Sequence, residues 1–184
     1  AVYGEIKEAT IVPTLDALGR VRREFVLGME FHAQDIGSGD PGRRWRGRVA
    51  CLNEARFAVA GFIAEGIYTG SHWWRPWSEA ILPDSRNDST GDVAVFVNSL
   101  ELAACGTLAF LGYQNRLGRE VRAYLTANWR IVEDVAALLL REETVDGEAI
   151  DRVVFEAADR HGLDIFAESI VAPWWKVPRS VMGR

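Results

Sequence analysis

Residues 43–67, RRWRGRVACLNEARFAVAGFIAEGI, decide the fold class. Apolar side chains recur in this stretch at intervals of three or four residues, the period of one face of an α-helix. The positions that share this face are Val49, Leu52, Ala55 (or Arg56), Val59, Ile63 and Ile67. Gly70 follows just beyond it, as is common where a helix ends. The stretch therefore predicts a long helix that buries one face in a core.

Three stretches further along the chain show the same helical period. The first begins at Gly91 or Asp92 and carries apolar residues as far as Ala104. The second runs from Gln114 to Glu142, and the third runs from Glu148 to Arg160. Thr144 or Asp146 can cap the last of these helices, because their side-chain oxygens accept from free backbone N–H groups. His161 and Gly162 are predicted to end it.

The N-terminal part of the chain has the pattern of strands. Residues 5–12, EIKEATIV, mix alternation with β-branched side chains and stop at Pro13. A turn at Leu18-Gly19 and a second strand over Val21–Met29 would make a hairpin, and residues 33–42 are predicted to be loop. The sequence thus predicts an α+β fold that is mainly helical, with an N-terminal β-hairpin or small sheet followed by a bundle of about four helices.

Composition narrows the class of protein. The chain has 184 residues, 48% of them apolar, and a formal net charge of −5, which argues against disorder. With 26 acidic and 21 basic residues, nucleic acid is not the expected main partner. Cys51 and Cys105 cannot form a disulfide framework and are expected to be buried thiols. No apolar run is long enough to span a membrane, and no charged segment followed by an apolar one stands at the start of the sequence, so we expect no signal peptide and a cytoplasmic location.

Candidate site residues are few. The histidines His32, His72 and His161 lack the spacing of four that places two imidazoles on one metal. His32 is predicted at the edge between a strand and a loop, where it could bind a ligand, although a surface or hydrogen-bonded role is favoured. Two groups of tryptophans are either binding surfaces or a satellite core: Trp73, Trp74 and Trp77, and Trp174 and Trp175.

Three carboxylates precede the second helix at a spacing of four residues: Asp84, Asp88 and Asp92. Their position at the start of a helix favours N-capping. The functional alternative is that one of them points into a site as a metal ligand. Spacing alone favours capping.

Three blocks of sequence occur in the order found in a known family. The first is ATIVP (9–13) with ALG (17–19), the second runs from RVACL (48–52) through VAGFIAE (59–65) to Gly70, and the third runs from VRAYL (121–125) to ETVDGEAI (143–150). Together they resemble the peptidase domain of FtsH-type ATP-dependent zinc metalloproteases, whose third block closes on E-T-L-D-G-E-E-I. The resemblance covers residues 5–155.

The resemblance implies a zinc cofactor, a polypeptide substrate and metal-assisted hydrolysis of peptide bonds. In the family, an H-E-x-x-H helix supplies two imidazoles and the glutamate that activates water, and a carboxylate at the start of a later helix completes the metal site. The family's N-D-[IL] at that helix resembles Gly91-Asp92-Val93. Asp92 is therefore the candidate zinc ligand, and Asp88 is the next choice.

The chain also departs from the family. The family's H-E-x-x-H lies just before the first block, where this sequence has only AVYG (1–4). We therefore expect either a metallopeptidase-like domain over residues 1–160 whose zinc helix is missing or lost, or a non-catalytic relative that acts as a helical binding or assembly module. Residues 161–184 are expected to form a tail that contains Trp and Pro. The binding module would hold a protein partner through its tryptophans, and the resemblance implies a homo-oligomer, because members of the family form rings.

Overall fold

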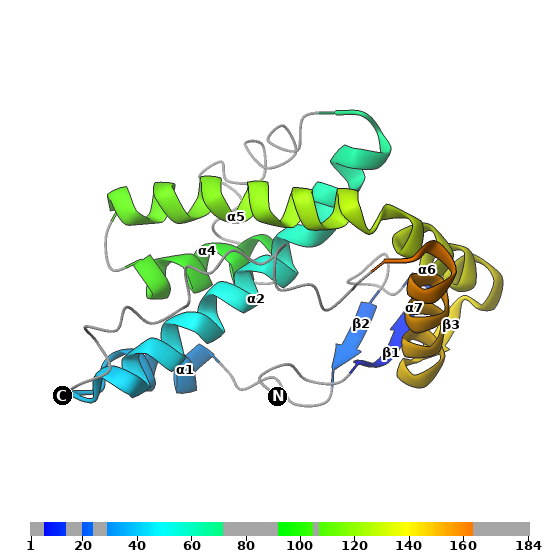
Figure 1. The fold of residues 1–184 in the computed structure, drawn as a ribbon. Helices are drawn as coiled ribbons and strands as arrows, with labels where there is room; N and C mark the ends of the chain where they lie inside the picture. The colour runs from blue at the N-terminus through cyan, green and yellow to red at the C-terminus, as the bar shows by residue number, and fades with distance from the viewer. Residues whose placement is uncertain (1–5, 14–19, 24–28, 72–91, 105–106, 164–184) are drawn as a thin grey trace. The chain divides into compact units, whose positions relative to one another are not determined.

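The computed structural model describes residues 6–13, 20–23, 29–71, 92–104 and 107–163 (Figure 1). The strands are β1 (Ile6–Thr10), β2 (Arg20–Arg23) and β3 (Thr144–Asp146). The helices are α1 (Met29–Ile36), α2 (Pro41–Tyr68), α4 (Asp92–Ala104), α5 (Thr107–Ala127), α6 (Trp129–Glu142) and α7 (Gly147–His161). The predicted fold class is confirmed, because the described chain is mainly helical and carries a small antiparallel sheet near its N-terminus.

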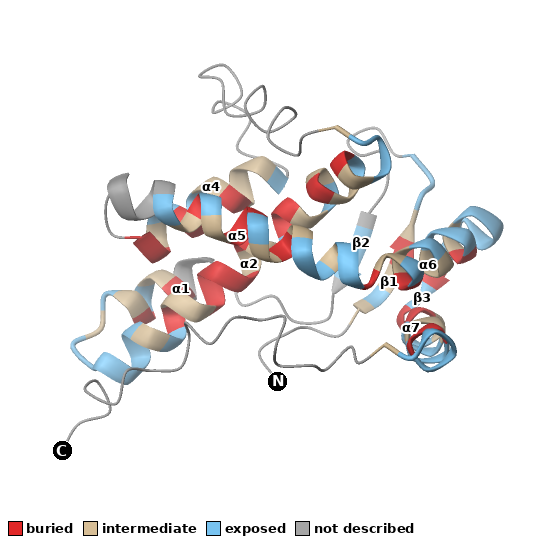
Figure 2. Cartoon of the chain, turned by 45° about the horizontal axis from the view of Figure 1, so that its top comes forward, coloured by how far each residue is buried: buried red, intermediate tan, exposed pale blue. Residues whose placement is uncertain are grey.

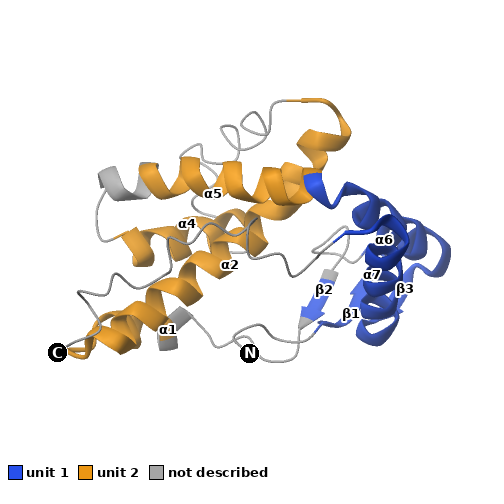
Figure 3. Cartoon of the chain, viewed as in Figure 1, with its two compact units in different colours: residues 1–26, 127–167 blue, residues 27–126, 168–184 orange. Residues whose placement is uncertain are grey.

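The chain divides into two compact units (Figure 3). Unit 1 comprises residues 1–26 and 127–167, so β1 and β2 come from the N-terminal part of the sequence, and β3, α6 and α7 come from its C-terminal part. Unit 2 comprises residues 27–126 and 168–184 and contains α1, α2, α4 and α5.

The sheet of unit 1 has the order β2-β1-β3, with both pairs antiparallel. Ala9 of β1 lies opposite Val21 on one side and Val145 on the other. Ala9 and Val145 are buried in one cluster with Leu138 of α6 and Ile150 of α7. The face of the sheet that carries Ala9 is thus closed by the two C-terminal helices. The three-residue strand β3 was not predicted; the sequence suggested only that Thr144 or Asp146 caps the next helix.

The N-terminus of α7 confirms one of the two predicted caps. Asp146 is the N-cap residue, and its Oδ1 accepts a hydrogen bond from the backbone N–H of Ala149 at 2.8 Å. At the other end, Gly162 has φ of 62°, a left-handed conformation that favours glycine, and its N–H donates to Asp159 at 3.1 Å. These two residues set the length of α7.

Replacing Asp146 with alanine is expected to lower the free energy of unfolding by about 1 kcal/mol, because the N–H of Ala149 loses its acceptor. Urea unfolding followed by circular dichroism would measure the change. Asp146→Ser, which keeps a capping oxygen, is the matched control and should recover most of the stability. Equal midpoints for Asp146→Ala and the wild type would contradict this role.

The core of unit 2 lies between α2, α4 and α5 (Figure 2). Phe96 and Leu100 of α4 are almost fully buried there, as the period of the sequence predicted. Leu117 of α5 completes the contact. The α2 residues in this cluster are Cys51, Leu52, Ala55, Ala58, Val59 and Ile63. Helix α2 thus buries the face that its sequence predicted, over bounds close to the expected ones.

Two predictions for the segment that contains α1 were wrong. Val21–Met29 was expected to be a strand and residues 33–42 a loop, but β2 ends at Arg23 and α1 runs from Met29 to Ile36. Its sequence, MEFHAQDI, is rich in residues that favour helices. At Gly47 of α2, an added Cβ would lie 2.9 Å from the backbone oxygen of His32, so glycine permits α1 and α2 to approach closely.

The predicted helix over Gln114–Glu142 is in fact two helices. Helix α5 ends at Ala127 and α6 begins at Trp129, with Asn128 between them. Asn128 has φ of −108° and ψ of 21°, outside the helical region, and its carbonyl accepts from the N–H of Ile131 at 2.9 Å. The apolar period continues on both sides of this residue, so the break is invisible to a periodicity argument. This break and α1 raise the expected four helices to six among the described residues.

Candidate functional site

The structure places the candidate metal ligand Asp92 at the first residue of α4, where it is exposed. A carboxylate is favourable in the first turn, because the backbone N–H groups there have no partner within the helix and form the positive end of its dipole. Asp84 and Asp88 lie outside the described residues. Among the described residues, no group of three or more His, Cys, Asp or Glu side chains is arranged to hold a metal ion.

The two histidines that the structure describes, His32 and His161, belong to different units. His32 is buried within α1 of unit 2, at 6% exposure, and not at a strand edge as predicted. His161 belongs to unit 1, where its Nε2 lies 3.3 Å from Oδ2 of Asp134 in α6. Arg160 reaches the same oxygen at 3.3 Å. His161 therefore helps to join the end of α7 to α6. His72 lies outside the described residues, as do the five tryptophans of the two predicted groups.

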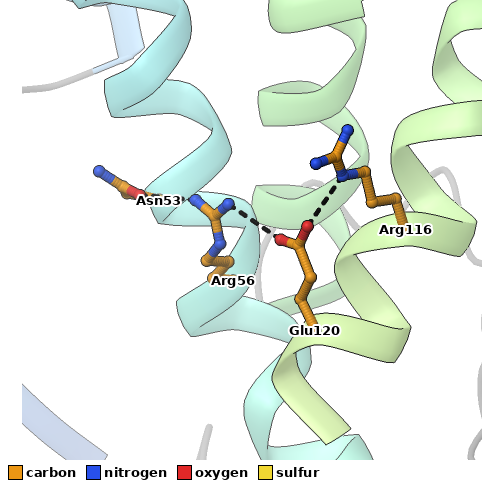
Figure 4. Close-up of polar contacts among 4 residues, drawn as sticks. All are labelled: Asn53, Arg56, Arg116 and Glu120. Atoms are coloured by element: carbon orange, nitrogen blue, oxygen red, sulfur yellow. Dashed lines mark hydrogen bonds and ion pairs between the residues drawn. The ribbon is translucent and has the colours of Figure 1, made fainter. Parts of the chain in front are cut away.

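A polar network that the sequence analysis missed connects α2 to α5 within unit 2 (Figure 4). Nη2 of Arg56 lies 3.2 Å from Oε2 of Glu120, and Nη1 of Arg56 donates to Oδ1 of Asn53 at 2.7 Å. Nε of Arg116 donates to Oε1 of Glu120 at 2.8 Å. The side chains of Arg56 and Glu120 are only 16% and 15% exposed.

The network pairs one carboxylate with two guanidinium groups. Each oxygen of the Glu120 carboxylate faces one guanidinium group. The buried side chain of Asn53 accepts a further hydrogen bond from Arg56. Such paired groups fix the position of two helices relative to each other. The sequence held one sign of this network. Either Ala55 or Arg56 could fill one position of the apolar face, and this ambiguity indicates an arginine at the edge of the core.

Cys51 is a buried thiol whose chemistry the structure constrains. Burial, together with the negative charge of Glu54, raises its pKa to about 11. Its side chain is fully buried in the core of unit 2. Because the thiolate is the reactive form, Cys51 is an inert core residue and not a nucleophile.

In a Cys105→Ser background, the Cys51 thiol is expected to react with Ellman's reagent at pH 8 only as fast as the protein opens. Raising the pH should also destabilise the fold between pH 9 and about 11, because the unfolded thiol ionises while the folded one stays protonated. A Cys51→Ala variant should lack that contribution. Immediate labelling of native protein at pH 8 would contradict the burial.

Comparison with known proteins gives no relative for this chain: no family model, no curated protein and no solved structure matches it. The helices of the described residues include none that is both long enough and apolar enough to cross a membrane.

Proposed function

We propose that this chain is a relative of the peptidase domain of FtsH-type zinc metalloproteases and takes part in the hydrolysis of peptide bonds. One observation supports the relationship. Ala9 and Thr10 at the start of the first block pair with Val145 and Thr144 of the third block, as neighbouring strands β1 and β3, although Thr10 and Thr144 are 134 residues apart in the sequence.

The residues of the third block have roles that explain the motif E-T-x-D-G-E. The hydroxyl of Thr144 lies 2.8 Å from that of Thr10, across the β1–β3 pair. Asp146 caps α7, and Gly147 lies where any Cβ would overlap the carbonyl group of Ile6. These structural roles of the matched residues in the sheet and at the start of α7 support the proposed relationship.

The described residues do not by themselves fit a catalytic zinc site. Asp92 is exposed, and no cluster of donors accompanies it in that part of the chain. Zinc in this proposal therefore rests on the resemblance, with Asp92 as one ligand, and no catalytic step is derived through the metal. The same exposure of Asp92 favours the second candidate function, a non-catalytic binding or assembly module with a protein partner.

Zinc content separates these two functions. We would measure zinc by elemental analysis in the protein made from its full reading frame, in an Asp92→Asn variant, and in Asp151→Asn as a control that removes another exposed carboxylate. Stoichiometric zinc that is lost only in Asp92→Asn supports the peptidase, and casein hydrolysis would then be tested. An absence of zinc from the wild-type protein overturns the peptidase function and leaves the binding module.

We also propose a cytoplasmic location and a homo-oligomer. The support for the location is Cys51, a buried free thiol of the kind that persists in a reducing compartment. The oligomer rests on the resemblance alone.

A further inference from the structure

Unit 2 carries a concentration of positive charge on a chain whose formal net charge is −5. The first two turns of α2 contain four arginines: Arg43, Arg44, Arg46 and Arg48. The first turn contains no acidic residue. Arg43 pairs with Asp35 at 2.8 Å. Arg44 and Arg46 are exposed and form no ion pair with any residue that the structure describes. We call Arg43, Arg44 and Arg46 the arginine end of α2.

Unit 1 carries the opposite charge on the outer face of α7. Glu148, Asp151, Glu156 and Asp159 are all exposed, and none of them forms an ion pair within the described ranges. Their spacing places them on the side of the helix away from the buried Ile150 and Ala157. Phe155, at 53% exposure, lies among them, and Arg152 is the one basic residue on this face. We call this surface the acidic face of α7.

The two surfaces are opposite in charge, and the acidic face is long enough to hold the end of a helix. From Glu148 to Asp159 the acidic face is about 17 Å long, and the end of a helix with its side chains is about 10–12 Å across. Guanidinium groups bind carboxylates well and also stack on aromatic rings such as that of Phe155. We propose that the arginine end of α2 in one copy of the chain docks on the acidic face of α7 in a second copy.

This contact joins two different surfaces and is small. One helix end against one helix face buries less than a stable protein–protein interface needs, about 1,200 Å². Charge supplies most of the attraction, so the association is expected to be weak and to decrease steeply with salt. The inference rests on the homo-oligomer proposed above and assigns its contact surfaces. It does not depend on zinc binding or on peptide hydrolysis, because neither surface includes Asp92.

Charge reversal with reciprocal rescue tests the proposal. Variant A carries Arg44→Glu and Arg46→Glu, and variant B carries Glu156→Arg and Asp159→Arg. Weight-average sedimentation coefficients are measured from low to high protein concentration, at about 20 mM and about 500 mM salt. The wild type should associate at low salt and dissociate at high salt. Each variant alone should associate at least about tenfold more weakly, because like charges then face each other.

An equimolar mixture of A and B should associate again, because the unchanged arginine end of B meets the unchanged acidic face of A, and the glutamates of A meet the arginines of B. An Asp134→Asn variant, which changes a carboxylate on α6, should behave as the wild type. A wild-type protein that stays monomeric at every concentration overturns the proposal. The proposal is also overturned if A and B each associate as strongly as the wild type. A third contrary result is a changed hydrodynamic radius of the monomer in each variant with no rescue in the mixture, because that result would indicate docking within one chain.

Discussion

The replacement of Gly147 with alanine is expected to destabilise the protein by about 3 kcal/mol, the upper end of the usual cost of overpacking. An added Cβ would overlap the carbonyl oxygen of Ile6 and lie 2.6 Å from its carbon. Both atoms belong to the backbone of β1, so no side-chain rotation relieves the clash. Because β1 is held by β2 and β3, the sheet would have to move away from α7. Urea denaturation would show a lower midpoint.

Gly61→Ala is the matched control, with the opposite expected sign. Gly61 lies in the middle of α2, and a Cβ there would meet nothing within 4 Å. Alanine is favoured over glycine in a helix by about 1 kcal/mol, so this variant should be slightly more stable than the wild type. A Gly147→Ala protein with an unchanged midpoint would contradict the close approach of α7 to β1.

The sequence predicted the parts of the fold that depend on local periodicity. Helices α2, α4 and α7 were found near their expected bounds because each buries one face in a core for several turns. Strand β3 escaped prediction, since three residues are too few to display an alternation and its partner β1 is far away in the sequence. The break at Asn128 was not predicted either, because a single non-helical residue leaves the apolar period of the sequence intact on both sides.

The candidate site shows the same limit. Asp92 was placed correctly at the start of a helix, but whether it binds a metal depends on which donors lie near it in space. The Arg56–Glu120 pair spans 64 residues and connects two helices that the sequence treats separately. Polar residues on opposite helices carry no shared period, so their pairing is visible only in the structure.

The Glu120→Gln substitution is expected to lower the free energy of unfolding by about 2 kcal/mol. It keeps the shape of the side chain but removes the carboxylate that both Arg56 and Arg116 face. Fully buried pairs cost more when one partner is removed, about 3–5 kcal/mol. Arg116 is 43% exposed and water can compensate part of its loss, so we expect a smaller effect here.

The control for Glu120→Gln is Glu133→Gln, which breaks the exposed Arg130–Glu133 pair at 3.6 Å. That change should cost less than about 0.5 kcal/mol, because solvent already screens the pair. A double-mutant cycle with Arg56→Met should give a coupling energy of about 1 kcal/mol between Arg56 and Glu120. Strictly additive effects in that cycle would mean that the two side chains lie close together without stabilising the contact between α2 and α5.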